Sequence, residues 1–529
     1  MKIKIVFILL FCFYTMLLHA QPSGVSLQAI SNYNQWGWNS VVMQNAFVTI
    51  AAVPAIGGRI MQYDLGSFPS IFINSAELGK TYTPAPSGQW HNFGGYKTLP
   101  APQSRWNVSG HWPPPPALDY GAYTIIDTVR TDDSVSVGLS SPVEQWTTPG
   151  ISFMRKATLY TGTSRVKMDQ TIVNNGTDTL NWSMWSITPS IVHHTNKSDY
   201  PNYWVYFRVD PNSVYGQSGV SPQGASTAWK GEIVPGIYGV QYVPDNNLIY
   251  SDPNRGWIAY ADLSDTVVFA KTFDVFSGAH YPDSARVTVY VSGTSPLYME
   301  IEVKSPIVEL TPEGGKYTFT ENWWAAKVRA PILEVNPVGA IARRLAYNSA
   351  TQALTAIYGT FHEGTAQVVF FDATRRVLYT GQQHAVSPLM EIQFQDTITI
   401  PNGAQTAEIQ VRNSKGDLVG VLDSADISEL STGIDRKTPA FPLEYRPASN
   451  YPNPFNPATT IKFTVLQKGV VSLKVFDLLG RQIAVLMDRI LAPGTYNTSF
   501  DGSHLPSGVY FYRLETGSIR ETHKLVLLK

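Results

Sequence analysis

The stretch Arg165-Val-Lys-Met-Asp-Gln-Thr-Ile-Val173 alternates apolar and polar side chains along most of its length. Val166, Met168 and Ile172 fall on one side of an extended chain, and the charged residues between them fall on the other. This pattern predicts a β-strand with one face buried in a core and the other face in solvent. Similar short stretches recur at 46–53, 135–139 and 286–292.

No helical periodicity separates these stretches, and Gly, Pro and Asn punctuate the chain between them. The 529 residues include 40 Gly, 36 Pro and 28 Tyr; 43% of them are hydrophobic and only 15% are charged. Such a composition supplies large cores and favours strands joined by turns. We therefore predict an all-β chain in which residues 26–330 form one large antiparallel sandwich.

A second set of short strands follows between residues 331 and 430, at 367–371, 390–394 and 407–411 among others. About seven short strands in about 100 residues are typical of an immunoglobulin-like sandwich. This segment has no cluster of titratable residues, so we interpret it as a spacer. The polar, proline-containing stretch 431–449 is predicted to be a linker.

The N-terminal residues have the pattern of a secretory signal peptide. Met-Lys-Ile-Lys precedes an apolar run from Ile5 to Leu18, and the small residue Ala20 suits cleavage after position 20. A membrane anchor would need about 20 apolar residues, so we expect no transmembrane segment after cleavage. The only cysteine, Cys12, lies in this run, so the mature chain is expected to lack disulfides, thiolate nucleophiles and Cys-ligated zinc.

Four segments near the C-terminus carry a recognisable order of motifs. They are Asn450-Tyr-Pro-Asn-Pro-Phe-Asn-Pro-Ala-Thr-Thr-Ile461, Val475-Phe-Asp-Leu-Leu-Gly-Arg481, Pro506-Ser-Gly-Val-Tyr-Phe-Tyr-Arg-Leu514 and Lys524-Leu-Val-Leu-Leu-Lys529. Together they resemble the type A sorting domain of the type IX secretion system of Bacteroidetes-like bacteria. The resemblance implies that residues 450–529 form a small β-sandwich. It also implies passage through the periplasm, recognition by the type IX translocon and cleavage by its sorting peptidase, which would leave a secreted or cell-surface product.

Motifs along the first 330 residues carry a second resemblance. They include Ala55-Ile-Gly-Gly-Arg-Ile60, His91-Asn-Phe-Gly-Gly-Tyr-Lys97, Gly110-His-Trp-Pro-Pro-Pro115 and Glu309-Leu-Thr-Pro-Glu-Gly-Gly315. In this order they resemble an uncharacterised family of the galactose-mutarotase-like superfamily, over residues 30–328. The resemblance implies a large β-supersandwich and a carbohydrate ligand, because the superfamily includes aldose epimerases and domains of polysaccharide hydrolases and lyases.

Two glutamates are the candidate catalytic carboxylates. An aldose epimerase needs a general base and a general acid, and the superfamily is expected to place a glutamate base on a late strand. The strand Tyr298-Met-Glu-Ile-Glu-Val303 puts Glu300 and Glu302 on one face, opposite an apolar face. The sequence does not choose between them, and two solvated carboxylates on an open sheet face are the alternative.

Adjacent histidines are the candidate acid. His193 and His194 follow a strand near the position at which mutarotases carry their first catalytic histidine. The usual His-x-Tyr-Phe-Asn-type segment is missing, however, which argues against ordinary mutarotase activity. Neighbouring residues of a strand point to opposite faces, so at most one of the two can reach a site. A surface pair is the alternative.

Arg59 and four tryptophans are candidate substrate-binding residues. Arg59 can bind a sugar hydroxyl or a uronate carboxylate through its donor fork, or form a structural salt bridge instead. Aromatic rings stack on the apolar faces of sugars. The candidates for this role, with core positions as the alternative, are Trp90, Trp106, Trp112 and Trp185.

Other ligand classes find no support in the sequence. The net charge of −1 gives no basic face for nucleic acid, and no residue spacing indicates a metal site or a cofactor. Two functions remain open. One is a secreted carbohydrate-active enzyme of the epimerase, hydrolase or lyase type. The other is a non-catalytic glycan-binding or structural cell-surface protein that has kept the fold.

Overall fold

The computed structural model describes residues 24–86, 88–192, 202–223, 230–431, 449–465, 469–491, 494–516 and 519–529. Almost all of the regular structure is β, which confirms the predicted fold class. The expected signal peptide at 1–20, both candidate histidines, and nearly all of the linker expected at 431–449 lie outside the described residues.

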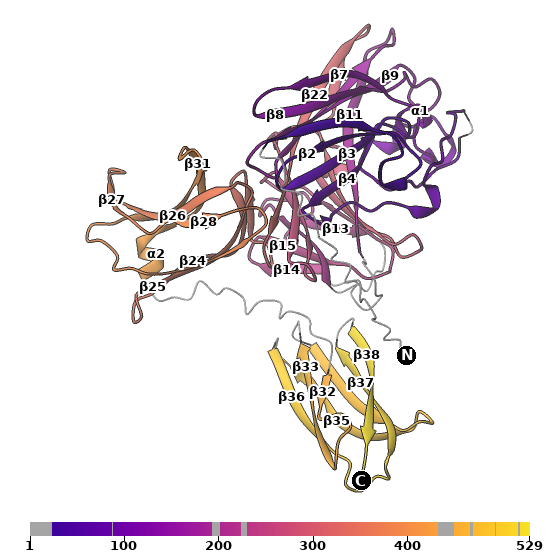
Figure 1. The fold of residues 1–529 in the computed structure, drawn as a ribbon. Coiled ribbons are helices and arrows are strands. Elements are labelled where there is room, and N and C mark those ends of the chain that lie inside the picture. Colours follow the sequence, from indigo (N-terminus) through magenta and orange to yellow (C-terminus); the bar gives the residue numbers. More distant parts are fainter. Residues whose placement is uncertain are drawn as a thin grey trace, which may run out of the picture.

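Two large sheets dominate the first part of the chain, drawn in indigo to pink in Figure 1. The larger contains ten strands in the spatial order β14 (Lys230–Val234), β15 (Ile237–Gln241), β12 (Tyr203–Arg208), β17 (Trp257–Asp262), β18 (Val267–Phe273), β22 (Gly315–Lys327), β10 (Val166–Asn174), β9 (Ile151–Tyr160), β8 (Ser134–Ser140) and β7 (Thr124–Arg130).

The second sheet contains seven strands. Their order is β13 (Val220–Gln223), β16 (Asn247–Ser251), β19 (Val287–Val291), β20 (Met299–Lys304), β11 (Leu180–Ser190) and β21 (Val308–Leu310), and β6 (Lys97–Ala101) also pairs with β11.

A smaller sheet and several short helices complete this part. The sheet contains β1 (Ser26–Ile30), β2 (Ser40–Gln44), β3 (Val48–Val53), β4 (Arg59–Leu65) and β5 (Phe68–Pro69). The helices are α1 (Pro116–Asp119) and the 3-10 turns η1 (Tyr33–Gln35), η2 (Ser75–Glu77), η3 (Gln103–Arg105), η4 (Ser109–His111) and η6 (Pro282–Ser284).

One apolar core lies between these sheets and explains their pairing. In β10 the alternation seen in the sequence holds, since Val166, Met168, Gln170 and Ile172 are buried and Lys167, Asp169 and Thr171 are partly exposed. The same core receives Ile301 and Val303 from β20. Burying alternate side chains from both sheets fixes the register of each strand, because a slip by one residue would turn its apolar set towards solvent.

Two further sheets form a second sandwich, drawn in orange in Figure 1. One contains β23 (Glu334–Asn336), β24 (Gly339–Asn348), β25 (Ala353–Thr360) and β29 (Glu391–Thr397). The other contains β27 (Val377–Thr380), β26 (Gly364–Phe371), β30 (Thr406–Asn413) and β31 (Leu418–Asp426), with β28 (His384–Val386) also paired to β26; α2 (Ile427–Ser431) follows.

The second sandwich packs against the first through an apolar cluster that draws residues from both. Trp324 of β22 stacks on Phe361, with ring centroids 5.1 Å apart. The Thr163 hydroxyl donates a hydrogen bond to the Phe361 carbonyl at 2.7 Å, and Arg329 forms an ion pair with Glu391. The two sandwiches are therefore joined by a packed interface.

The C-terminal residues form a third, smaller sandwich, drawn in yellow in Figure 1. Its sheets contain β32 (Ser449–Tyr451), β33 (Ala458–Val465) and β36 (Gly494–Asp501), and β35 (Gln482–Leu491), β34 (Gly469–Phe476), β37 (Gly508–Thr516) and β38 (Ile519–Leu527). Val471, Leu473 and Val475 are buried in its core, as their alternation predicts. Within the part of the chain that the structure describes, no helix has the length and apolar character needed to cross a membrane.

Candidate functional site

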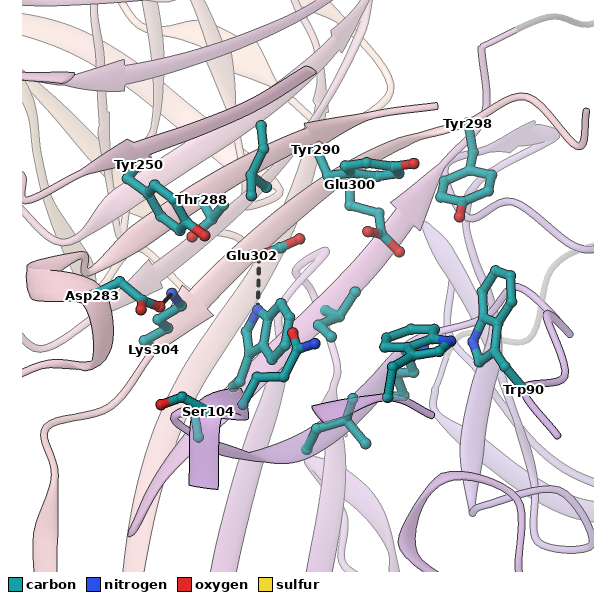
Figure 2. Close-up of a pocket in the computed structure, with 18 residues that line it drawn as sticks. Trp90, Ser104, Tyr250, Asp283, Thr288, Tyr290, Tyr298, Glu300, Glu302 and Lys304 are labelled. Atoms are coloured by element: carbon teal, nitrogen blue, oxygen red, sulfur yellow. Dashed lines mark hydrogen bonds and ion pairs between the residues drawn. The ribbon is translucent and has the colours of Figure 1, made fainter. Parts of the chain in front are cut away.

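A cavity of about 440 Å³ opens on the face of the seven-stranded sheet that is turned away from the core (Figure 2). Strand β20 divides its side chains between the two faces. Ile301 and Val303 enter the core, whereas Glu300, Glu302 and Lys304 line the cavity. The predicted alternation therefore places both candidate glutamates on the cavity side.

Glu302 lies in the middle of a row of side chains that crosses five strands. Thr288 of β19 is directly opposite it, and Tyr250 of β16 is opposite Thr288. On the other side Ile187 of β11 is opposite Glu302, and Lys97 of β6 is opposite Ile187. All five residues line the cavity. Directly opposed residues of paired strands have side chains in contact range, so the sheet itself assembles this row from distant segments.

Loops supply the ends of the cavity. Trp90 and Trp112 lie at one end with ring centroids 5.5 Å apart, and their side chains are 38% and 42% exposed. At the other end the Lys304 ammonium donates to the Asp283 carboxylate at 2.8 Å. Figure 2 shows Asp283 and Lys304 at one end, Trp90 at the other, and Glu302 and Glu300 between them.

Glu302 is held by a hydrogen bond from a predicted binding residue. The Trp185 indole N–H donates to Glu302 Oε2 at 2.7 Å, and the glutamate is only 1% exposed. Burial raises the pKa of Glu302, while the Lys304 charge and the Trp185 hydrogen bond act in the opposite direction. Trp185 therefore lines the cavity and also favours the charged form of Glu302.

Glu300 is partly exposed and lines the cavity beside Glu302. Burial raises the pKa of Glu300 to about 8, the nearby Glu302 charge raises it further, and Lys97 lowers it. At neutral pH Glu300 is therefore mainly the uncharged acid. Its proton is available for donation to a ligand in the cavity.

Lys97 connects the cavity to a buried charge cluster behind it. Its ammonium lies 3.8 Å from Asp119 Oδ1 and 6.0 Å from the centroid of the Trp90 ring. Burial lowers the pKa of Lys97, and Asp119 opposes that effect. Asp119 in turn accepts a hydrogen bond from Arg59 at 2.6 Å.

Arg59 does not line the cavity. Its side chain is 1% exposed, and its guanidinium donates to the Asp119 carboxylate and to the Gly94 carbonyl at 3.1 Å. The sequence left two roles open for Arg59, ligand binding and a structural salt bridge, and in the structure Arg59 forms the salt bridge.

Trp106 is also placed in the protein interior. It is 1% exposed, and its indole N–H donates to the Pro100 carbonyl at 2.8 Å. Its ring lies 6.4 Å from that of Trp112, and its own carbonyl bonds to the His111 ring at 2.9 Å. Trp106 therefore supports the loop that carries Trp112 and does not form the cavity wall.

Several cavity residues were not among the sequence candidates. Lys304 lies two residues after Glu302 on β20, so the alternation of this strand could have predicted that Lys304 faces the cavity. Tyr290 lies on a predicted strand, but its partner strand was not predictable. Lys97 and Asp283 gave no local signal, because only the fold brings them to the glutamates. His193 and His194 lie outside the described residues.

Groups of three or more His, Cys, Asp or Glu side chains that could hold a metal ion do not occur among the described residues. The carboxylates at the cavity instead have protein partners: Glu302 has the Trp185 indole, and Asp283 has the Lys304 ammonium.

Comparison with known families identifies the C-terminal sandwich. Residues 449–528 match the family described as secretion system C-terminal sorting domain. This match confirms the type IX sorting domain indicated by the sequence motifs, and such a domain directs export to the cell surface or to the outside. It also implies an interaction with the secretion system. No curated protein matches the chain.

Solved structures similar to the chain include two galactose mutarotase-like proteins. The protein from Clostridium acetobutylicum is 11% identical, with a TM-score of 0.36, and the match covers 57% of this chain and 98% of that one. The protein from Lactobacillus casei is 10% identical, with a TM-score of 0.36, and the match covers 54% and 99%. These identities and TM-scores assign no activity.

Proposed function

We propose that this exported protein binds carbohydrate in the cavity of the seven-stranded sheet and transfers protons to and from the bound sugar. The observation that carries the proposal is the Glu300–Glu302 pair, which lies in a cavity walled by Trp90, Trp112 and Trp185. A cavity of about 440 Å³ falls within the range typical of small-molecule sites.

The chemical character of the walls supports a sugar as the ligand. A pyranose has an apolar face of C–H groups, which suits an indole ring, and an edge of hydroxyl groups, which needs donors and acceptors. Trp90 and Trp112 offer the rings, and Asp283, Lys304 and Tyr290 offer polar groups in the same cavity.

Proton transfer is supported by the different surroundings of the two glutamates. Glu300 is uncharged at neutral pH because its pKa is about 8, so it can act as a general acid. Glu302 receives the Trp185 hydrogen bond and lies near the Lys304 charge, both of which favour its carboxylate form as a general base. Two neighbouring carboxyl groups, one of which accepts an indole hydrogen bond that favours its charged form, suit acid–base chemistry at a sugar ring.

The rest of the chain fits delivery of this domain. We propose residues 1–20 as a cleaved signal peptide and residues 331–430 as a spacer. We also propose removal of residues 450–529 by the sorting peptidase after export. The cavity residues all lie between positions 90 and 304, so the proposed activity does not depend on the sorting domain.

The test is a screen of the purified protein against a panel of sugars and polysaccharides, with both binding and turnover measured. The variants are Glu300→Gln and Glu302→Gln, and Glu309→Gln on β21 is the control because Glu309 is exposed and does not line the cavity. We expect turnover to fall at least about tenfold in both cavity variants and to be unchanged in the control.

Two other outcomes would change the proposal. Binding without turnover in any form of the protein would favour the non-catalytic glycan-binding alternative. Absence of binding to every sugar tested would overturn a carbohydrate role for the cavity.

A further inference from the structure

The cavity extends along strand β20. Tyr298, Glu300, Glu302 and Lys304 occupy alternate positions and all line it. At about 3.3 Å per residue, the distance from Tyr298 to Lys304 is roughly 20 Å. Figure 2 shows the same order from Tyr298 and Trp90 at one end to Lys304 and Asp283 at the other. This length is greater than that of a single pyranose ring.

The first end is an aromatic platform formed by Trp90 and Trp112. Large exposed aromatic side chains that lie close together indicate an interaction site when the protein holds them in place. The Trp112 loop is held by internal contacts: Gln103 Nε2 donates to the His111 carbonyl at 2.9 Å, and Trp106 is anchored in the interior. These contacts hold the loop that carries Trp112 in place.

The second end is a charged pair with free hydrogen-bonding capacity. Lys304 is buried against the rings of Tyr250 and Trp185, at 4.9 and 5.6 Å, and donates to Asp283. The Asp283 side chain is 50% exposed. A carboxylate acceptor beside an ammonium donor suits neighbouring hydroxyl groups of a sugar, since each hydroxyl both donates and accepts.

The backbone at the second end is held in an uncommon conformation. Asp283 and Ser284 both have positive φ, at 56° and 57°. The Tyr215 hydroxyl donates to the Asp283 carbonyl at 2.5 Å, which fixes this turn over the sheet. Non-glycine residues in this region of φ and ψ are uncommon and are found disproportionately at functional sites.

The proton-transfer pair lies between these two ends. We infer that the ligand is an oligosaccharide with sugar units on both sides of the Glu300–Glu302 pair. One unit stacks on the Trp90–Trp112 platform, and the hydroxyl groups of another bond to Asp283 and Lys304. This inference rests on the proposed carbohydrate function and specifies its substrate class: the ligand is a chain, and a single monosaccharide fills only part of the cavity.

The experiment measures binding as a function of chain length. Isothermal titration calorimetry of the purified protein uses glucose, xylose, mannose and galactose, together with their β-linked oligomers of two to five units. The variants are Trp112→Ala and Asp283→Asn, which alter opposite ends, and Tyr379→Ala is the control because Tyr379 is an exposed aromatic residue on the second sandwich. A circular dichroism spectrum of each variant reports its folding.

For at least one sugar, we expect affinity to rise on going from one unit to two. Trp112→Ala should remove this gain and weaken disaccharide binding by about tenfold. Asp283→Asn should weaken the disaccharide as well, and the control should behave as wild type.

The remaining outcomes separate the inference from the function on which it rests. Equal affinity for one unit and for longer chains, or a length dependence that survives both variants, overturns the inference but leaves carbohydrate binding in place. Absence of binding to all of these sugars overturns the proposed function and the inference with it.

Discussion

Replacing Glu300 with Gln should make the protein more stable at pH 8 and should have little effect at pH 5. In the folded protein the pKa of Glu300 is about 8, compared with 4.5 for an ordinary glutamate. Between these values the folded state binds a proton that the unfolded state has lost, so wild-type stability falls as pH rises through this window. Glutamine resembles the protonated acid in shape and cannot ionise.

The size of this stability difference follows from the shift in the pKa of Glu300. One pKa unit corresponds to about 1.4 kcal/mol, so ionisation of Glu300 costs the folded state at most about 5 kcal/mol above pH 8. Below pH 4.5 both states are protonated and this cost vanishes. The stability of Glu300→Gln relative to wild type should therefore increase steadily between pH 5 and pH 8.

Urea unfolding at pH 5, 6, 7 and 8, followed by tryptophan fluorescence, measures this difference. All 13 tryptophans lie between positions 36 and 324, so the signal reports on the sandwich that contains Glu300. Glu309→Gln is the matched control, because that exposed glutamate should leave the pH dependence unchanged. Parallel stability curves for wild type and Glu300→Gln would refute the inference that Glu300 holds its proton at neutral pH.

Three further predictions concern the Trp185–Glu302 hydrogen bond, the Arg59–Asp119 ion pair and the sorting domain. Trp185→Phe removes the indole hydrogen bond that favours the charged form of Glu302, so the pKa of Glu302 should rise further. An NMR titration of its carboxyl carbon would measure this rise, and an unchanged pKa would count against the contact. Asp119→Asn leaves Arg59 buried without its partner and should lower the free energy of unfolding by about 3–5 kcal/mol in urea, whereas a loss below about 1 kcal/mol would contradict the buried pair. Deletion of residues 449–529 should abolish delivery to the cell surface or medium in a host with a type IX system, as judged by immunoblots of cell fractions; normal delivery would contradict the sorting role.

The sequence predicts features that depend on one segment at a time. The alternation of β20 was sufficient to place Glu300 and Glu302 on the same face, and the alternation of β10 was sufficient to predict its buried side. The C-terminal motifs were likewise sufficient to identify the sorting domain. Each of these predictions needs only the period of a strand or the order of a motif.

Features that depend on pairing between distant segments were not predictable. Lys97 reaches the glutamate row because β6 pairs with β11, and Asp283 reaches Lys304 through a turn. We expected Arg59 and Trp106 to contact a ligand, yet Arg59 pairs with Asp119 and the Trp106 indole donates to the Pro100 carbonyl inside the protein. An arginine or a tryptophan looks the same in the sequence whether its side chain donates to a ligand or to a buried acceptor of the protein.

The most direct test of oligosaccharide binding in the cavity is a crystal structure of the protein soaked with an oligosaccharide that binds in solution. We predict sugar density in the cavity, with one ring against Trp112, another beside Asp283, and the linkage between them within hydrogen-bond distance of Glu300 or Glu302. Ordered sugar elsewhere on the protein, with this cavity unoccupied, would contradict it.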